Sequence, residues 1–209
     1  SNICSYHFTF KTPDPEEITV EQLSYAKQII NDFETALYGD NFKDSQLGYR
    51  RYIDVNNFAC WFLVNNICEN LDTNWYFFKT DSDNPLRMGP VWDAEWSFGL
   101  GWGQAPSPVE GMIITKYFVR LWEDEYFRET VQNIWSTHKE RIKQEVVQQI
   151  NNDYEKLLLS QEANFSRWNL LNDFISVGNV ALATYNNEVQ YVKDFFLRRM
   201  DWLDTYLSQ

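Results

Sequence analysis

The sequence predicts a mainly α-helical protein with one small β-hairpin, built as a single domain over residues 1–209. Apolar residues recur at helical spacing through most of the chain, and two short aromatic runs flank an Asp-Asn-Pro turn. No internal repeat or low-complexity linker divides the sequence. Hydrophobic residues make up 44% of the chain and aromatic residues 17%, so we expect a packed core rather than disorder.

The N-terminal part is predicted to hold a short strand and then a helix. Residues 3–11 alternate polar and apolar side chains and end before Pro13, which is typical of a strand. Residues 19–40 are predicted to be helical because Thr19 and Gln22 can form a capping box and Gly39 is placed to end the helix. The apolar stripe of this helix consists of Leu23, Ala26, Ile30, Phe33 and Leu37.

A second helix is predicted over residues 55–70, after a polar connection at residues 40–52. Asp54 is a good N-cap because its carboxylate can accept hydrogen bonds from the unpaired backbone N–H groups of the first turn. The side chains predicted to share one side of this helix are Phe58, Trp61, Phe62 and Asn65.

Two short runs, residues 74–80 and 86–93, are rich in aromatic and β-branched side chains and predict the hairpin. A Gly-rich and Trp-rich loop follows at residues 94–111, in which we interpret Pro106-Ser107-Pro108 as a loop and, as a hypothesis, a mobile lid. From Met112 onward the pattern is helical. The three predicted helical segments are residues 116–142, 145–168 and 186–207.

The chain carries a net charge of −12, which disfavours binding to nucleic acid phosphates and to anionic lipid. No apolar run approaches eighteen residues, so no segment is expected to span a membrane. An acidic surface also fits an extracellular or cell-envelope protein, which is the location we expect. Only His7 and His138 are present and no cysteine pair has zinc spacing, so a His/Cys metal site is not expected.

The three cysteines are predicted to be buried, small apolar side chains. Cys60 and Cys68 are eight residues apart on one predicted helix, which separates them by about 12 Å along its axis. That distance is too long for a disulfide within a straight helix.

Asp72 and Asp93 are the candidate catalytic pair. They are separated by the predicted hairpin, and a hairpin returns the chain to near its start, so both carboxylates should lie at the same end of it. Protein kinases place a catalytic-loop Asp and a metal-binding Asp in this way around a hairpin. Two alternatives stay open: either Asp can be a turn cap or a solvated charge, and Asp93 can be a buried acid that caps a loop.

Residues 36–79 and the block RMGPVWDAEWSFG at residues 87–99 resemble the corresponding parts of spore coat protein H (CotH) kinase-like proteins. The later patterns LWEDEYFRETV, NFSRW and RRMDWLD are similar to the C-terminal helices of that family. The resemblance implies the helical C-lobe of an atypical protein kinase-like fold. It also implies transfer of phosphate from ATP to a protein Ser or Thr hydroxyl, although some fungal members act as surface adhesins.

The resemblance assigns Asp93 as the ligand of Mg²⁺ or Mn²⁺ and Asp72 as the catalytic-loop acid. Glu95 is a second candidate metal ligand, since the family usually has an acidic residue there. Asn70 and Glu69 flank the loop and could orient Asp72. The resemblance identifies no residues for binding ATP itself. Hard oxygen ligands suit Mg²⁺ or Mn²⁺ better than zinc.

Three departures from the family pattern qualify these roles. Ala94 stands where an aromatic residue is common, and Glu95 is one methylene longer than the usual Asp. Phe77 occupies the position, five residues after Asp72, where ordinary kinases have a metal-binding Asn. No Gly-rich phosphate loop followed by a strand Lys occurs. The only G-x-G, Gly99-Leu100-Gly101, follows Asp93 and extends to Gly103.

We therefore expect the N-terminal ATP-binding lobe to be absent and this fragment alone to be inactive. Its expected partners are that missing lobe and a protein substrate on the cell surface or envelope. An alternative function is a non-catalytic surface binding or adhesion module that retains the kinase-like fold, and Ala94 with Glu95 favours it. A third, a carbohydrate-binding domain, depends on a set of tryptophans that is more simply explained as core. That set is Trp61, Trp75, Trp92, Trp96 and Trp102.

Two charged positions are predicted to be structural. Arg198 and Arg199 are interpreted as surface ion pairs with Asp201 and Asp204 along the last helix. His138 is interpreted as a solvated side chain rather than a catalytic base.

Overall fold

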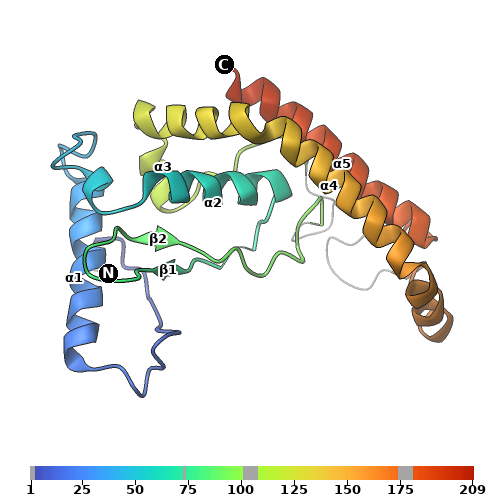
Figure 1. Cartoon of the computed structure of the whole chain (residues 1–209), viewed down its shortest axis with the longest axis horizontal. Helices are drawn as coiled ribbons and strands as arrows, with labels where there is room; N and C mark the ends of the chain where they lie inside the picture. The colour runs from blue at the N-terminus through green and yellow to red at the C-terminus, as the bar shows by residue number, and fades with distance from the viewer. Residues whose placement is uncertain (1–2, 73, 101–107, 174–180) are drawn as a thin grey trace.

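Helices dominate the structure, a computed structural model that describes residues 3–72, 74–100, 108–173 and 181–209 (Figure 1). The elements, in chain order, are α1 (Val20–Tyr38), the short 3₁₀ helix η1 (Tyr49–Arg51), α2 (Val55–Cys68), β1 (Phe77–Phe78), β2 (Arg87–Met88), α3 (Tyr117–Leu121), α4 (Glu125–Arg167) and α5 (Tyr185–Leu207). The prediction of a mainly α protein with one small hairpin is confirmed. No helix in the described ranges has the length and apolar character needed to cross a membrane.

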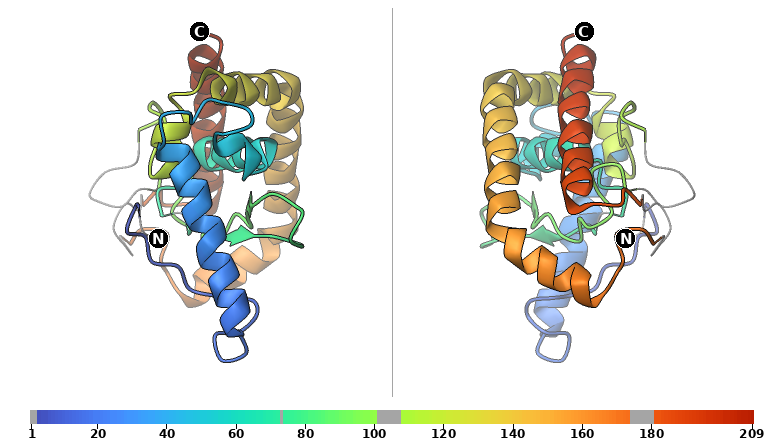
Figure 2. Two further views of the ribbon diagram at one scale, coloured as in Figure 1. Left: turned by 90° about the vertical axis from the view of Figure 1, so that its left-hand side faces the viewer. Right: turned by 90° about the vertical axis from the view of Figure 1, so that its right-hand side faces the viewer.

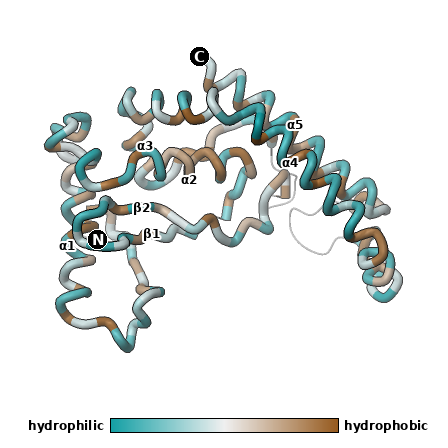
Figure 3. Tube along the Cα trace, in the orientation of Figure 1, coloured by the Kyte–Doolittle hydropathy of each residue, from teal (hydrophilic) through white to brown (hydrophobic). Residues whose placement is uncertain are grey.

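Helix α2 lies at the centre of the fold and packs against α4, α5 and β2. Its own residues are mostly apolar and are not confined to one stripe, as the colouring in Figure 3 indicates, and such a helix is stable only when it is largely buried. Its N-terminus begins where predicted, because the Asp54 carboxylate accepts a hydrogen bond from the Asn57 N–H at 2.9 Å. The helix ends at Glu69, whose backbone is left-handed (φ 53°, ψ 49°).

Helix α1 confirms the predicted capping box. The Thr19 hydroxyl accepts from the Gln22 N–H at 3.2 Å, and the Gln22 side chain accepts from the Thr19 N–H at 2.9 Å. Gly39 ends the helix in an extended rather than left-handed conformation, with φ −75° and ψ 168°. Phe33 and Leu37 are the fully buried members of the predicted stripe.

The hairpin is shorter than predicted, because only two residues of each run form a ladder. Phe77 pairs with Met88 and Phe78 pairs with Arg87, in antiparallel register. The Asp81 carboxylate closes the turn by accepting hydrogen bonds from two backbone N–H groups, those of Asp83 and Asn84, both at 2.9 Å. This local network holds the two strands in register.

The predicted strand at residues 3–11 is wrong. This segment forms no ladder and instead runs as irregular chain between α1 and the hairpin. Its contacts are made by side chains: Phe8 meets Phe77 edge to face, with ring centroids 5.8 Å apart. The Cys4 N–H donates to the buried Glu34 carboxylate at 3.3 Å. Alternation of polar and apolar residues thus reflects packing on two neighbours rather than pairing in a sheet.

The C-terminal helices differ from prediction in where they break. The predicted segment 116–142 is divided at residues 122–124, because the Asp124 carboxylate caps a new helix by accepting from the Tyr126 N–H. The predicted gap between residues 142 and 145 does not exist, since α4 continues to Arg167. Helices α4 and α5 lie side by side, and α4 bends so that its first part reaches α2 (Figure 2).

Two predictions about single side chains are also wrong. Arg199 is fully buried rather than paired on the surface, because its position on α5 faces α2. Its Nε donates to the Asn66 carbonyl at 2.7 Å and its Nη1 to the Val109 carbonyl at 2.5 Å. Cys60 is exposed rather than buried, and all three cysteines are free thiols.

We expect Asp54→Ala to lower the free energy of unfolding by about 1–2 kcal/mol, because it removes the N-cap of the central helix. The substitution also removes the ion pair between Asp54 and Arg87, 3.1 Å apart, which is partly exposed and adds little. Urea unfolding followed by circular dichroism measures the effect. Asp40→Ala is the control, since Asp40 is an exposed acid that caps no helix. Equal stability of the two variants would contradict the capping role.

Candidate functional site

Asp93 lies five residues after β2 ends and is held by an amide from the segment that precedes β1. The Asn74 Nδ2 donates to the Asp93 Oδ2 at 2.8 Å, across nineteen positions of sequence. The Asp93 backbone is left-handed, with φ 64°, a conformation that Asp and Asn tolerate better than most residues. The side chain is exposed, so the carboxylate is open to a ligand, and the alternative of a buried loop cap is wrong.

Asp72 lies in the bend that follows α2 and is half-buried. It is two residues before Asn74, so the hydrogen bond from Asn74 to Asp93 brings the loop that carries Asp72 next to the end of the hairpin. The hairpin therefore returns the chain as predicted.

Glu95 is exposed in a turn two residues after Asp93. Within the described ranges, no three His, Cys, Asp or Glu side chains are grouped so that they alone could hold a metal ion. The acids at this site thus offer fewer than a full set of protein ligands. Magnesium sites in nucleotide enzymes often have only one or two carboxylates, because phosphate oxygens and water supply the rest.

Unusual backbone conformations gather around these loops. Six non-glycine residues in the described chain have a positive φ. Four of them lie near this site: Glu69 at the end of α2, Asp93 and Phe98 after the hairpin, and Lys116 at the start of α3. Such conformations cost energy and concentrate at functional sites. The Lys116 Nζ lies 4.6 Å from the centroid of the Trp75 ring, next to Asn74, and burial lowers the pKa of this lysine.

Gly99 fixes the segment after Asp93 against α5. Its φ is 87°, and a Cβ there would lie 2.7 Å from both the Phe195 ring and the Tyr191 hydroxyl. Only glycine can therefore occupy this position without displacing α5. The Tyr191 hydroxyl donates to the Gly99 carbonyl at 3.2 Å. Gly101 and Gly103, which complete the predicted glycine cluster, lie outside the described residues, as do Trp102, Pro106 and Ser107 of the predicted loop.

Buried polar side chains lie behind the two loops. Glu69 and Asn70 precede Asp72, and both are almost fully buried. Burial raises the pKa of the Glu69 carboxyl to about 7, and the charge of Arg199 opposes that rise. Burial alone raises the pKa of the neighbouring Cys68 thiol to about 11.

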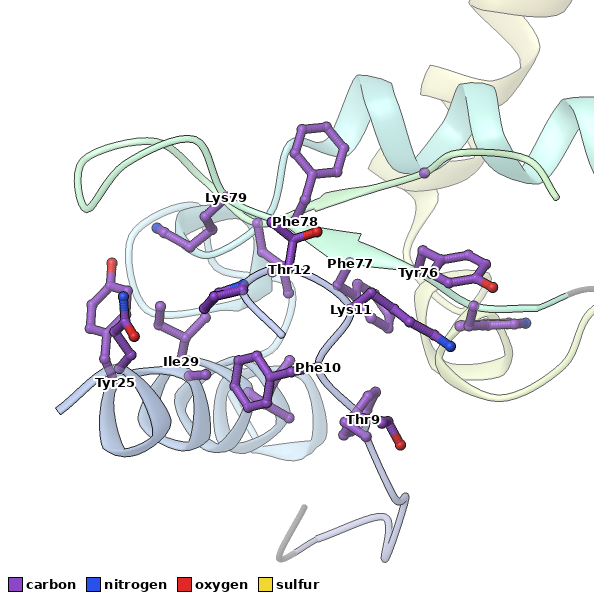
Figure 4. A pocket seen from close by; sticks show the side chains of 18 of the residues that line it. Thr9, Phe10, Lys11, Thr12, Tyr25, Ile29, Tyr76, Phe77, Phe78 and Lys79 are labelled. Atoms are coloured by element: carbon purple, nitrogen blue, oxygen red, sulfur yellow. The ribbon is translucent and has the colours of Figure 1, made fainter. Parts of the chain in front are cut away.

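An aromatic groove of ≈ 630 Å³ runs along the hairpin, between β1, α1 and residues 8–13. Figure 4 shows Thr9–Thr12 crossing between α1 and the hairpin, with Lys11 directed toward Tyr76. The rings that line the groove are Phe8, Phe10, Tyr25, Trp75, Tyr76, Phe77 and Phe78. Its Trp75 end adjoins Asn74, and Tyr76 meets Trp92 edge to face with ring centroids 6.5 Å apart. The groove therefore ends close to Asp93.

The tryptophans expected to form core do so only in part. Trp61 is buried and stacks on Phe118, with ring centroids 5.7 Å apart and planes at 10°. Trp75 and Trp96 are half-buried. Trp92, by contrast, is 57% exposed beside Asp93. His138 lies on α4 and is half-buried.

Sequence analysis missed Asn74 and the groove. Asn74 lies two residues after a candidate acid, but its partner could not have been found from the sequence. The pairing of Phe77 with Met88, if continued, would set Asn74 opposite Val91 rather than Asp93. The groove could not have been found, since it depends on where residues 8–13 cross the fold.

A family model described as CotH kinase protein matches residues 5–203, which is nearly the whole chain. This match confirms the resemblance seen in the sequence. A comparison with curated proteins gave no match.

Proposed function

Because the chain belongs to the CotH kinase family, we propose that it is part of a kinase that transfers phosphate from ATP to a protein Ser or Thr hydroxyl, with Mg²⁺ or Mn²⁺. In this proposal the helices form the C-lobe of an atypical protein kinase-like fold, and a further lobe supplies the Gly-rich loop and lysine that hold the nucleotide phosphates. The protein acceptor is proposed to lie on the cell surface or envelope.

The hydrogen bond between Asn74 and Asp93 is the observation that carries this proposal. It joins the loop after α2 to the segment after β2 and so supports the proposal that Asp72 and Asp93 act in one site. Phosphoryl transfer depends on positioning and on neutralising charge, and two such acids would supply this lobe's part of it.

The donor set fits a hard divalent cation. Asp93 would supply an exposed carboxylate, and Glu95 and the carbonyl oxygen of Asn74 are further oxygen donors in the same region. When bound, Mg²⁺ would neutralise the charge of the phosphate oxygens. In the proposed site Asn74 orients the Asp93 carboxylate through its amide N–H.

We propose that Asp72 accepts the proton of the acceptor hydroxyl. As that proton leaves, the hydroxyl oxygen forms a bond to the γ-phosphorus of ATP, and the bond from this phosphorus to its bridging oxygen breaks to release ADP. Asp72 is half-buried in the bend that follows α2, so part of the residue is accessible to an acceptor.

The aromatic groove is the proposed place of the nucleotide base. Planar bases stack on aromatic faces, and a groove of ≈ 630 Å³ has the size of typical small-molecule sites. Since the groove ends near Asn74, a nucleotide whose base lay in it could extend its phosphates toward Asp93. Lys11, directed toward Tyr76, would contribute a positive charge on that path (Figure 4).

A titration of the full-length protein that carries this chain tests the proposal. We expect calorimetry to show ATP binding in the presence of Mn²⁺ and binding at least about tenfold weaker without the metal, because the ion links the phosphates to Asp93. Asp93→Asn should lose this metal dependence. A protein that shows no heat with ATP and metal would contradict the kinase proposal.

That contrary result would favour a non-catalytic surface binding or adhesion module. One observation supports this second candidate: Ala94 and Glu95 depart from the residues usual in the family after the metal-binding Asp. Adhesion needs a stable fold but no nucleotide, so calorimetry separates the two functions.

A further inference from the structure

A buried polar cluster lies between the end of α2, the segment after Asp93 and helix α5. We define it by four residues that are each at most 4% exposed: Glu69, Asn70, Ser97 and Arg199. None of them belongs to the proposed contact between Asn74 and Asp93. They lie immediately behind it, since Glu69 and Asn70 precede Asp72 and Ser97 follows Asp93 by four positions.

Two hydrogen bonds bring the three parts of the cluster together. The Phe98 N–H donates to the Cys68 carbonyl at 2.7 Å, which places Ser97 next to Glu69. The Arg199 Nε donates to the Asn66 carbonyl at 2.7 Å, which fixes α5 against the last turn of α2. Glu69 and Arg199 also influence each other's pKa, so their charges are close.

Several polar atoms of the cluster have no hydrogen-bond partner among the described residues. These atoms are Glu69 Oε2, Asn70 Oδ1 and Nδ2, Ser97 Oγ and Arg199 Nη2. Only two other described residues, Arg50 and Trp61, have such an atom, so four of the six are gathered here. Unpartnered polar atoms destabilise a fold, and their concentration behind a site indicates a role there.

The charges of the cluster restrict what can join these atoms. The Arg199 guanidinium disfavours a metal cation, and the Glu69 carboxylate disfavours an anion when it is ionised. A neutral hydrogen-bonding molecule of the size of water can serve both, because it donates to Glu69 Oε2 and accepts from Arg199 Nη2. The cluster thus fits a water molecule that bridges Glu69 and Arg199.

We propose that the buried polar cluster positions the loops that carry Asp72 and Asp93 by fixing both of them to α5. Glu69, Ser97 and Arg199 are then positioning residues rather than catalytic ones. The purpose of the cluster rests on the proposed function. Whether the cluster holds the two loops in place can be measured without any reaction.

Glu69 gives the cluster a dependence on pH. Its pKa is raised to about 7 by burial, whereas an exposed glutamate has a pKa near 4.3, so the closed cluster binds a proton more tightly than an opened one. The charged and titratable groups around it are Arg199 and Tyr191 on α5, Cys68 on α2 and, beside Arg199, Glu110. Closure is therefore most favoured at low pH and weakens as the pH rises through about 7.

Hydrogen exchange of the Phe98 and Asn70 amides tests this inference, because these N–H groups bond to the Cys68 and Asn65 carbonyls only when the loops are fixed. After correction for intrinsic exchange, we expect both amides to exchange about tenfold faster at pH 8 than at pH 6. Glu69→Gln should remove this change, since its amide does not titrate. The Leu86 amide, bonded to the Tyr52 carbonyl, is the control within the same sample.

Ser97→Ala provides a second test that does not depend on pH. Removal of Ser97 Oγ from the network should speed exchange of the Phe98 amide several-fold. It should also lower the rate of phosphate transfer at saturating ATP and leave the KM for ATP unchanged. Unchanged exchange in Ser97→Ala, or a pH response that persists in Glu69→Gln, would overturn the inference. If the variants show the expected faster exchange but the wild type transfers no phosphate, the positioning role stands and only the proposed function is refuted.

Discussion

Asp93→Asn is expected to lower the rate of phosphate transfer by about 10²–10³-fold or more, with little change in the stability of the fold. The substitution removes the negative charge that the proposed site directs at the metal. It keeps the size of the side chain, and asparagine tolerates the left-handed backbone at this position (φ 64°). The asparagine oxygen can still accept from Asn74, so the loop geometry is preserved. Transfer of labelled phosphate to a Ser/Thr substrate protein by the full-length protein that carries this chain measures the effect.

The control for this experiment is Asp32→Asn, which removes the same charge from an exposed residue of α1 that does not line the groove. It should leave the rate within about twofold of the wild type, since a single surface charge is largely screened. If Asp93→Asn also kept the wild-type rate, Asp93 would not hold the metal. A rate that fell equally in both variants would indicate an effect of net charge instead.

Phe118→Ala is expected to lower the free energy of unfolding by about 3–5 kcal/mol, which is a large part of the stability of a domain. Phe118 on α3 is buried and lies at the centre of the aromatic core. The rings within 6.3 Å of its own centroid are those of Phe58, Trp61, Phe62, Trp75 and Phe127. Truncation would leave a cavity, because the surrounding rings belong to α2, to α4 and to the segment before β1 and cannot all move into the space together.

Urea unfolding followed by tryptophan fluorescence measures this loss. Val119→Ala is the matched control, since Val119 is the next residue of α3 and is 52% exposed. We expect the control to change stability by about 0.5 kcal/mol or less. A loss below about 1.5 kcal/mol for Phe118→Ala would show that the core rearranges to fill the space.

The two variants also distinguish fold from function. Phe118 contacts Trp75, which follows Asn74, so the core lies directly beneath the proposed site. A protein that unfolds more easily should lose activity only near its transition, whereas Asp93→Asn should lose it at every temperature. Measuring transfer rates well below the unfolding midpoint separates the two causes.

Local signals predicted α1, the start of α2 and the turn of the hairpin correctly. In each case the stabilising hydrogen bonds join residues a few positions apart, such as Thr19 with Gln22 and Asp54 with Asn57. The break within residues 116–142 was missed although its signal is also local. Asp124 is an N-cap, but the apolar pattern on either side of it continues without interruption.

The sequence by itself determined the helical class, the hairpin, the family and the two candidate acids, because these depend on spacing and on short motifs. Only the tertiary structure decided that Asn74 holds Asp93, that Arg199 is buried behind the loops and that residues 3–11 form no strand. The physical reason is that these outcomes depend on contacts between distant segments. How α2, α5 and the N-terminal segment pack together sets such contacts, and no short stretch of sequence encodes them.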